Sequence, residues 1–541
     1  MSLCINHRPA GSARRRAYVR FGAALLATIG TIALLAGCVN AGPNPSSPNA
    51  SSGASGVSGN LTIVDTIYPP TLDPQNTTNS STNKVVRPMY DTLVAYTPGT
   101  GPELVGELAT AWTESSDQTS YTFTLREGIT FHSGNPFSAA DVVYTLNRIK
   151  SIGTGIAVNI EPFESAIAVS PTEVKVTLST SYRPFLGALV RVYILDSKLM
   201  TENAGDDNGQ AYLADHDAGS GPYMLAENVS TTSTSFKYFP DYWKGWDGKH
   251  FETAKFKYEP EGATQQADLT AGTADIALGL PREAYETLGP DLTVVASDSL
   301  EGLYAHMNYR SGIMENPTAR KAIAAAFDYE TFSKNIMVGY SSVAKGPLSS
   351  QMACFSPSTD VPTFSLDTAK KLAEQAGIVG KTVNILYLPH LADEVQGFQL
   401  LQSALNKIGV NAVAQPTAWP AYTELLKSPE TTPDIAFSYA YPLFPDPNEV
   451  LNINYNSAFV GATNYGGYTN ATVDQLLTTA RGQSITDSCA TYKKVVTQIV
   501  ADSPSLWISD NKYVIAMSSG VKGYDYNVSQ HKSIDIYSLS K

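Results

Sequence analysis

Three short segments of the 541-residue chain contain side chains of the kinds that enzymes and metal sites use. In the run Asp215–Asp217, three adjacent residues cannot all face one metal ion, so a solvated loop is the favoured interpretation. Ser220 lies between two glycines but lacks the spacing of a nucleophile elbow. Gly380–Thr382 ends like a phosphate-binding loop, yet Gln375 occupies the place of the first glycine and a predicted strand follows. The sequence therefore predicts neither a catalytic site nor a metal site, and no cofactor.

A basic and then apolar segment at the N-terminus ends at a cysteine. The basic part contains Arg14, Arg15, Arg16 and Arg20, and the apolar stretch Phe21–Ala36 follows it. This stretch has about 16 residues, fewer than the roughly 20 that span a bilayer, so residues 1–37 are interpreted as an export signal. Because Cys38 follows Ala36 and Gly37, the segment resembles the lipobox of bacterial lipoproteins. That resemblance implies lipidation of Cys38, which would anchor the chain at the extracytoplasmic face of the cell membrane. An ordinary cleaved signal and an uncleaved anchor are the alternatives.

A flexible tether is predicted to follow, over residues 38–60. Residues 40–60 are almost all Asn, Ala, Gly, Pro and Ser, a composition that cannot bury a core. We expect the globular body to begin at Leu61.

The chain is acidic, with a formal net charge of −13. The predicted signal contains arginines and no acidic residue, so the exported part is more acidic still. Because an acidic surface repels phosphate groups, we expect no nucleic-acid partner. No stretch after the signal is apolar enough to span a membrane, and the length suffices for two or three domains.

Two cysteines, Cys354 and Cys489, remain in the exported part once Cys38 is set aside. Disulfides persist outside the cytoplasm, so a Cys354–Cys489 bridge is predicted, with two buried free thiols as the alternative. The chain has no CxxC pair, so the sequence supports neither a zinc ribbon nor a thioredoxin-like site.

Hydrophobic periodicity predicts the main elements. Tyr121–Arg126 and Glu173–Leu178 alternate as half-buried strands do. Ser138 with Asp141 predicts a capped helix start, and Asn316–Lys334 has helical spacing.

Residues 382–440 carry the clearest architectural pattern. Strands are predicted at Val383–Leu388, Val410–Gln415 and Asp434–Ala440, and helices at Ala392–Lys407 and Trp419–Lys427. This alternation predicts a parallel sheet covered by helices, and hence an α/β fold.

Aromatic residues are abundant, with 30 Tyr, 18 Phe and 5 Trp. They gather at Tyr238–Trp246 and Tyr439–Phe444. Tyrosine-rich clusters suit a cleft lined by amphipathic rings, and core packing is the alternative.

A long ordered block, Gly106–Ile149, resembles the solute-binding proteins of peptide- and nickel-type ABC transporters (bacterial extracellular solute-binding proteins, family 5). It contains YTFTLR, Arg126-Glu127-Gly128, Phe131-His132 with Gly134, Pro136-Phe137 and Ala140-Asp141-Val142. Further similar segments extend the resemblance over most of the exported chain, at Tyr90–Val94, Gly219–Tyr223, Asp241–Trp243, Gly302–Tyr309 and Asn316–Phe327.

The resemblance implies a two-lobed type II periplasmic-binding-protein fold (cluster C) with an extra subdomain in lobe I. Lobe I is then expected over residues 61–90, 216–303 and 511–541, and the inserted subdomain over 91–215. Lobe II is expected over 304–510. Chain crossings near Leu303 and Ser509 would form the hinge, and we expect a monomer.

The resemblance also implies where a ligand would bind. The expected acceptor of a peptide's α-ammonium group is Asp446, with a turn-forming aspartate as the alternative. Backbone groups for pairing with an extended ligand are expected at Ser438, Tyr439, Ala440 and Tyr441, and at Thr66, Ile67 and Tyr68. Trp419, Trp243 and Tyr304 are candidate pocket residues.

The function that this resemblance implies is capture of short peptides and their delivery to the permease subunits of an ABC importer, without chemistry on the ligand. The alternatives are the same fold with another solute, such as a nickel chelate, haem or an oligosaccharide, and a surface hydrolase.

Overall fold

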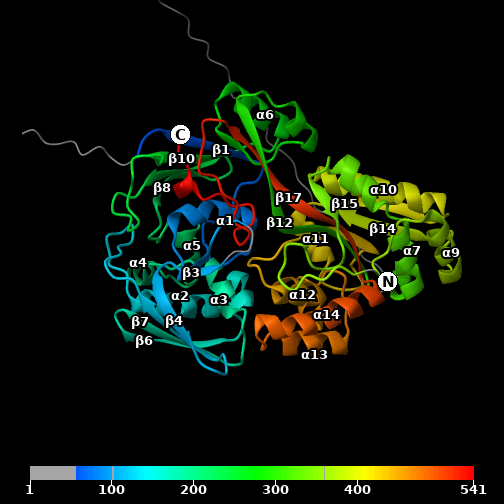
Figure 1. Ribbon diagram of the computed structural model, residues 1–541, viewed down its shortest axis with the longest axis horizontal. Helices are drawn as coiled ribbons and strands as arrows, with labels where there is room; N and C mark the ends of the chain where they lie inside the picture. The colour runs from blue at the N-terminus through cyan, green and yellow to red at the C-terminus, as the bar shows by residue number, and fades with distance from the viewer. Residues whose placement is uncertain (1–56, 100–102, 311, 359) are drawn as a thin grey trace, which may run out of the picture. The chain divides into compact units, whose positions relative to one another are not determined.

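The computed structural model describes residues 57–99, 103–310, 312–358 and 360–541 (Figure 1). The predicted signal, Cys38 and most of the predicted tether lie outside the described residues. The ordered body begins before Leu61, because Val57 is buried and pairs with His250, and the first strand starts at Asn60. Among the described residues, no helix combines the length and apolar character that a membrane span requires.

One large sheet runs through the body, in the order β15-β14-β16-β12-β17-β11-β1-β10-β9-β8, with β13 paired to β17. Its strands are β1 (Asn60–Asp65), β8 (Tyr223–Val229), β9 (Ser233–Tyr238), β10 (Thr253–Tyr258), β11 (Ile276–Ala277), β12 (Leu292–Met307), β13 (Ser341–Val343), β14 (Thr382–Tyr387), β15 (Asn411–Pro416), β16 (Ile435–Ala440) and β17 (Ser505–Ser518). It carries elements from both ends of the chain, so its pairing cannot be read from local patterns.

Strands β12 and β17 connect two hydrophobic cores. They pair antiparallel, and the register shifts between Asp298 and Gly302 and again at Leu303. Figure 1 shows the two strands side by side, running from near α6 (Gly262–Ala271) toward α14 (Ile485–Asp502). Tyr304 packs in one core, whereas Leu303 packs in the other, because neighbouring strand residues point to opposite faces.

The predicted parallel region is confirmed. β14 pairs parallel with both β15 and β16. The helix α10 (Ala392–Lys407) has the predicted bounds, and α11 (Trp419–Leu425) ends two residues earlier than expected. Together with α7 (Pro317–Ala326) and α9 (Leu366–Ala376), α10 encloses a core of alanine, larger aliphatic and aromatic residues on this part of the sheet.

A separate four-stranded antiparallel sheet forms within residues 109–178. Its order is β4-β5-β7-β6, with β4 (Ala109–Glu114), β5 (Ser120–Leu125), β6 (Phe163–Ser170) and β7 (Glu173–Leu178). The predicted strands are β5 and β7, and the predicted helix is α2 (Ala139–Ile152), whose start has the expected capping box. α2 packs on β6 and has a core of its own.

The remaining described elements are shorter. They are β2 (Val94–Tyr96), β3 (Leu104–Gly106), α1 (Ser80–Val86), α3 (Phe185–Ala188), α4 (Ser197–Glu202), α5 (Gln210–Leu213), α8 (Tyr329–Thr331), α12 (Pro447–Tyr455) and α13 (Ala471–Ala480). The 3₁₀ helices are η1 (Arg87–Met89), η2 (Gly155–Ile160), η3 (Leu189–Arg191), η4 (Arg282–Thr287), η5 (Gly312–Glu315), η7 (Ser457–Phe459) and η8 (Ile536–Ser538), and η6 (Phe332–Ile336) is a π-helix.

The single helix expected at residues 316–334 is broken at Phe327 and Asp328, and helical structure resumes at Tyr329 as α8 and then η6. α7 ends at Ala326, because Phe327 is extended and its ring is fully buried. The Asp328 side chain then accepts from the backbone N–H of Thr331 at 3.0 Å and starts α8. A side chain that offers the backbone an alternative hydrogen bond breaks a helix that its hydrophobic spacing would continue.

The predicted disulfide is confirmed: Cys354 and Cys489 are bonded, with their Cα atoms 4.8 Å apart. Cys489 lies in α14, so the bond ties that helix to the loop after β13.

Replacing both cysteines with serine is expected to lower the free energy of unfolding by about 2–4 kcal/mol, because the bond closes a loop of 135 residues in the unfolded chain. Urea unfolding of the variant and of the wild type, each with and without reductant, measures this. Reductant should shift the wild-type midpoint and leave the variant unchanged. Equal midpoints for the oxidised wild type and the variant would contradict the prediction.

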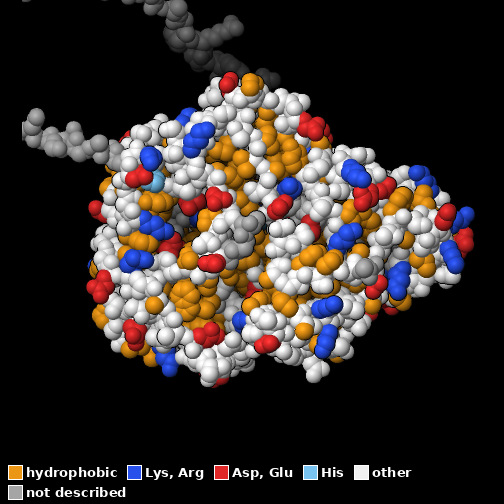
Figure 2. Space-filling view, viewed as in Figure 1, with side chains coloured by type: hydrophobic (Ala, Val, Ile, Leu, Met, Phe, Trp, Pro, Cys, Tyr) orange, Lys and Arg blue, Asp and Glu red, His pale blue; other side chains and the backbone are white. Residues whose placement is uncertain are grey.

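Charged side chains are dispersed over the face that Figure 2 shows. Lys and Arg are scattered there, several of them beside Asp or Glu, and do not gather into one basic patch. This is consistent with the acidic balance of the chain.

Candidate functional site

The outer edge of β16 lacks a strand neighbour at its C-terminal half. β16 pairs with β12 from Ile435 to Ala440, but its described pairing with β14 is limited to Ile435 and Ala436. The Tyr422 hydroxyl donates to the carbonyl of Phe437 on that outer side. Because backbone groups alternate along a strand, the N–H and C=O of Tyr439 face the same outer side. An extended ligand could pair there, beside the predicted residues Ser438, Tyr439 and Ala440.

Aromatic rings and charged groups cover this edge. The Tyr439 hydroxyl donates to Asp393 Oδ2 at 2.7 Å, and Asp393 also pairs with Arg282 at 3.4 Å. The ring of Tyr441 stacks on that of His531 with centroids 4.1 Å apart, and Lys532 lies over the Tyr439 ring. Ser438 and Ala440 are buried in this conformation.

Glu301 binds the segment His531–Lys532, whose side chains contact Tyr439 and Tyr441. Glu301 Oε2 lies 2.6 Å from Lys532 Nζ and 3.2 Å from His531 Nε2. Burial alone would raise the pKa of Glu301, but the neighbouring Lys532 and His531 hold it well below its usual range. Burial lowers the pKa of His531 to about 4. Glu301 therefore stays ionised and Lys532 is its counter-charge at neutral pH.

Asp446 has two partners within the protein. Its carboxylate forms a two-point ion pair with the guanidinium of Arg183, in which Arg183 Nη2 lies 3.1 Å from Oδ1. Oδ1 also accepts from the backbone N–H of Asn448 at 2.9 Å and so caps α12. Pro447 at the first helical position agrees with this cap. A ligand ammonium group at Asp446 would have to share a carboxylate that already holds a cation and a helix end.

The segment after β1 is more open. Ile67 and Tyr68 are 45% and 46% exposed. Tyr68 meets the ring of Tyr258 edge-on at 6.4 Å, and Thr66 Oγ1 accepts from Gln265 Nε2 at 3.1 Å. Ile67 and Tyr68 thus present apolar surface that the core does not use.

The other three predicted pocket residues lie in different surroundings. Trp243 Nε1 donates to Asp91 at 3.1 Å, and both Arg126 and Lys244 lie over its ring. Tyr304 is buried and its hydroxyl donates to the carbonyl of Pro347 at 2.9 Å. Trp419 is 46% exposed and stacks on Tyr422. The predicted residues Ser438–Tyr441 thus lie at the edge of β16. The polar atoms of Trp243 and Tyr304 are instead hydrogen-bonded to Asp91 and to the carbonyl of Pro347.

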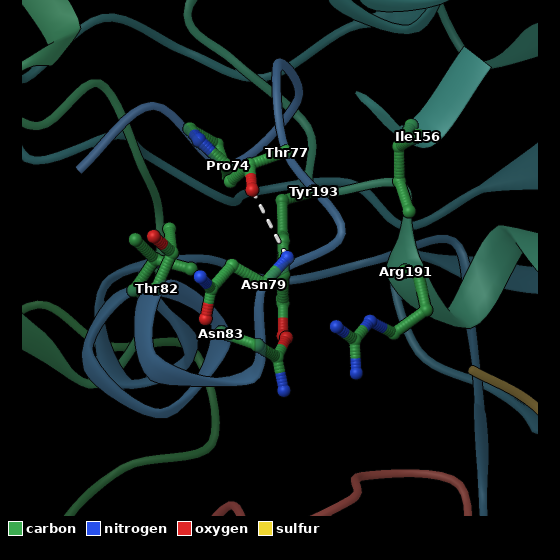
Figure 3. Close-up of a pocket in the computed structure, with 9 residues that line it drawn as sticks. Pro74, Thr77, Asn79, Thr82, Asn83, Ile156, Arg191 and Tyr193 are labelled. Atoms are coloured by element: carbon green, nitrogen blue, oxygen red, sulfur yellow. Dashed lines mark hydrogen bonds between the residues drawn. The ribbon is translucent and has the colours of Figure 1, made fainter. Parts of the chain in front are cut away.

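A pocket that sequence reasoning missed lies between α1 and η3 (Figure 3). It is small, with a volume of about 10 Å³ that suffices for about one water molecule, and its polar lining comes from Thr77, Asn79, Thr82, Asn83, Tyr193 and Arg191. Figure 3 shows the guanidinium of Arg191 directed toward Asn83 and Tyr193. Arg191 is 3% exposed, and its Nη1 atom is buried without a hydrogen-bond partner among the described residues. The available signal was a single arginine inside the apolar run LVRVYIL.

Comparison with known proteins shows the family of this chain. The family model of the bacterial extracellular solute-binding proteins, family 5, matches residues 103–461. A curated relative, the probable D,D-dipeptide-binding periplasmic protein DdpA of Escherichia coli strain K12, is 28% identical over 497 residues, which are 89% of this chain and 94% of the relative.

Solved structures give the fold. The dipeptide-binding protein from Pseudoalteromonas sp. SM9913 in complex with Met-Leu has a TM-score of 0.81 and 24% identity, over 89% of this chain and 100% of the other. NikZ from Campylobacter jejuni in complex with Ni(L-His) has a TM-score of 0.77 and 20% identity, over 89% and 99%. The expected type II periplasmic-binding-protein fold is confirmed, and the chain belongs to the bacterial extracellular solute-binding proteins, family 5.

Proposed function

We propose that the protein is the substrate-binding receptor of an ABC importer, that it captures short peptides, and that it delivers them to a membrane permease. The observation that carries the proposal is the unpaired outer edge of β16 at Ser438–Ala440, beside the rings of Tyr439 and Tyr441. Backbone pairing suits ligands of varied sequence, because every peptide presents the same N–H and C=O groups. The printed ligands of DdpA and of the Pseudoalteromonas protein, a D,D-dipeptide and Met-Leu, support this class.

We further propose the lobe boundaries expected from the sequence. Lobe I comprises residues 61–90, 216–303 and 511–541, the inserted subdomain residues 91–215, and lobe II residues 304–510. The register shifts of β12 around Gly302 and Leu303 lie at the proposed hinge. Opening there would expose the buried edge of β16, and a ligand that contacts both lobes would favour closure.

The proposed receptor is a monomer that performs no chemistry on its ligand and needs no cofactor. It is held at the extracytoplasmic face of the cell membrane through a lipid on Cys38, after removal of residues 1–37. Mass spectrometry of the membrane-extracted protein tests the anchor, because a diacylated N-terminal Cys38 has a mass that an unmodified thiol lacks.

Asp446 stays a prediction as the acceptor of the ligand's ammonium group. Asp446→Asn keeps an oxygen for the cap of α12 and removes the charge. A loss of affinity for peptides with a free N-terminus, with no loss for N-acetylated peptides, would support this role.

Mass spectrometry of small molecules released by denaturing the lipid-free protein tests the proposed function. A mixture of short peptides supports it, and isothermal titration with those peptides then gives affinities. A single non-peptide solute, such as a metal chelate, would overturn the peptide assignment and leave the family membership intact. Hydrolysis of an added peptide would overturn the assignment as a receptor without catalysis.

A further inference from the structure

Arg191 differs from the other buried lysine and arginine side chains of the described residues. Those other cations have partners at hydrogen-bond distance: the pairs are Lys84 with Asp65, Arg148 with Asp73, and Arg320 with the carbonyl of Asp502. Nη1 of Arg191 is instead buried with no hydrogen-bond partner among these residues. Because a guanidinium keeps its proton in proteins, burying it is costly unless an anion lies beside it.

The described acidic side chains leave most of this charge uncompensated at neutral pH. No Asp or Glu lines the pocket toward which the guanidinium is directed (Figure 3). Glu449 and Arg87 both act on Arg191 electrostatically, and the charge of Arg87 adds to the positive potential. Burial raises the pKa of Glu449 to about 8, so most of its carboxyl is protonated at pH 7. The counter-charge of Arg191 therefore has to come from outside the chain.

The polar lining of the pocket suits an anion, because its acceptors are used and some of its donors are not. Asn83 Oδ1 accepts from the Tyr193 hydroxyl at 2.8 Å. Asn79 Oδ1 accepts from two groups in the first turn of α1, and Thr77 Oγ1 accepts from the N–H of Asn79 at 3.0 Å. The hydrogen bonds of the described residues use neither the side-chain N–H groups of Asn79 nor the hydroxyl hydrogen of Thr77. These groups and Arg191 Nη1 are donors without acceptors.

The size of the pocket selects the anion. Its volume of about 10 Å³ suffices for about one water molecule. Chloride is only slightly larger than water, whereas sulfate, phosphate and carboxylate groups need more space. A water molecule would fill the pocket but would leave the charge of Arg191 uncompensated, so a small monatomic anion is favoured.

We propose that Arg191 binds a chloride ion in this pocket, with the amide of Asn79 and the hydroxyl of Thr77 as further donors. The lining comes from residues 74–86 on one side and from residues 156–193 on the other. A bound ion would join these two segments and so stabilise the folded protein. The inference goes beyond the proposed function and does not depend on it, because no peptide takes part.

Thermal unfolding at constant ionic strength tests the site in solution. Stepwise replacement of sodium gluconate with sodium chloride should raise the wild-type midpoint by about 1–3 °C, and the rise should saturate as a single site fills. Sodium bromide should act in the same way. A wild-type midpoint that is the same in gluconate and in chloride would overturn the inference.

Variants assign the effect to Arg191. Arg191→Met should lose the chloride dependence, whereas the matched control Arg481→Met, which removes the ion pair with Glu161, should keep it. Arg191→Lys retains a cation and should keep a weaker dependence, which provides the comparison if Arg191→Met does not fold. An undiminished chloride dependence in the Arg191 variants would place the ion elsewhere and overturn the inference.

Anomalous scattering locates the ion directly. Crystals grown in sodium bromide should show an anomalous peak at hydrogen-bond distance from Arg191 Nη1, because bromide replaces chloride. A water molecule at that position, with no anomalous peak, would contradict the proposal. A bromide peak without any halide dependence of the midpoint would mean binding at crystal concentration only, and would also overturn it.

Discussion

Replacing Asp73 with alanine is expected to lower the free energy of unfolding by about 3–5 kcal/mol. Asp73 Oδ2 lies 2.6 Å from Arg148 Nη2, and Oδ1 lies 3.1 Å from Nη1. The two side chains are 0% and 2% exposed. Without Asp73, the Arg148 guanidinium would stay buried with only Gln75 Oε1 and the Asn208 carbonyl as acceptors. An uncompensated buried charge costs far more than a surface ion pair contributes.

Urea unfolding at pH 7 measures this loss. Asp298→Ala is the matched control, because Asp298 pairs with Lys512 at 3.4 Å while both side chains are more than 40% exposed. The control should lose less than about 1 kcal/mol. Asp73→Ala combined with Arg148→Met removes both charges and should recover part of the loss. Equal losses for Asp73→Ala and the surface control would contradict the prediction.

Replacing Asp446 with alanine is expected to cost a similar amount, about 3–5 kcal/mol, for two reasons. The guanidinium of Arg183, whose side chain is 15% exposed, would lose its counter-charge. The first turn of α12 would also lose its cap at the Asn448 N–H, which is worth about 1 kcal/mol.

Two variants separate these contributions. Asp446→Asn retains a cap oxygen and should lose only the part that belongs to the ion pair. Adding Arg183→Met to Asp446→Asn removes the unpaired charge and should recover part of that loss. Differential scanning calorimetry of the variants gives the ranking. If Asp446→Ala were as stable as the wild type, the ion pair would not contribute to stability, and Asp446 would be free for a ligand.

The sequence predicted best where the determinants are local. The helix Ala392–Lys407 was located with its bounds, because its hydrophobic spacing and the glycine after it act within a few residues. The strands at residues 382–440 followed from short apolar runs. The Cys354–Cys489 bond followed from the number of cysteines left after the predicted signal and Cys38 are set aside, although its partners lie 135 residues apart.

The tertiary structure alone decided which charges are paired and which are left over. In the sequence, Asp446 lies between two prolines, with no charged partner next to it. Its partner in the fold, Arg183, lies 263 residues away in the sequence. Arg191 lies in an apolar run, and the fold leaves its Nη1 atom buried without an acceptor. The cost of a buried charge depends on groups that the fold brings from distant segments, so no local pattern records it. The family and its fold could thus be predicted from the sequence, whereas the ion pair of Asp446 with Arg183 and the burial of Arg191 required the three-dimensional arrangement.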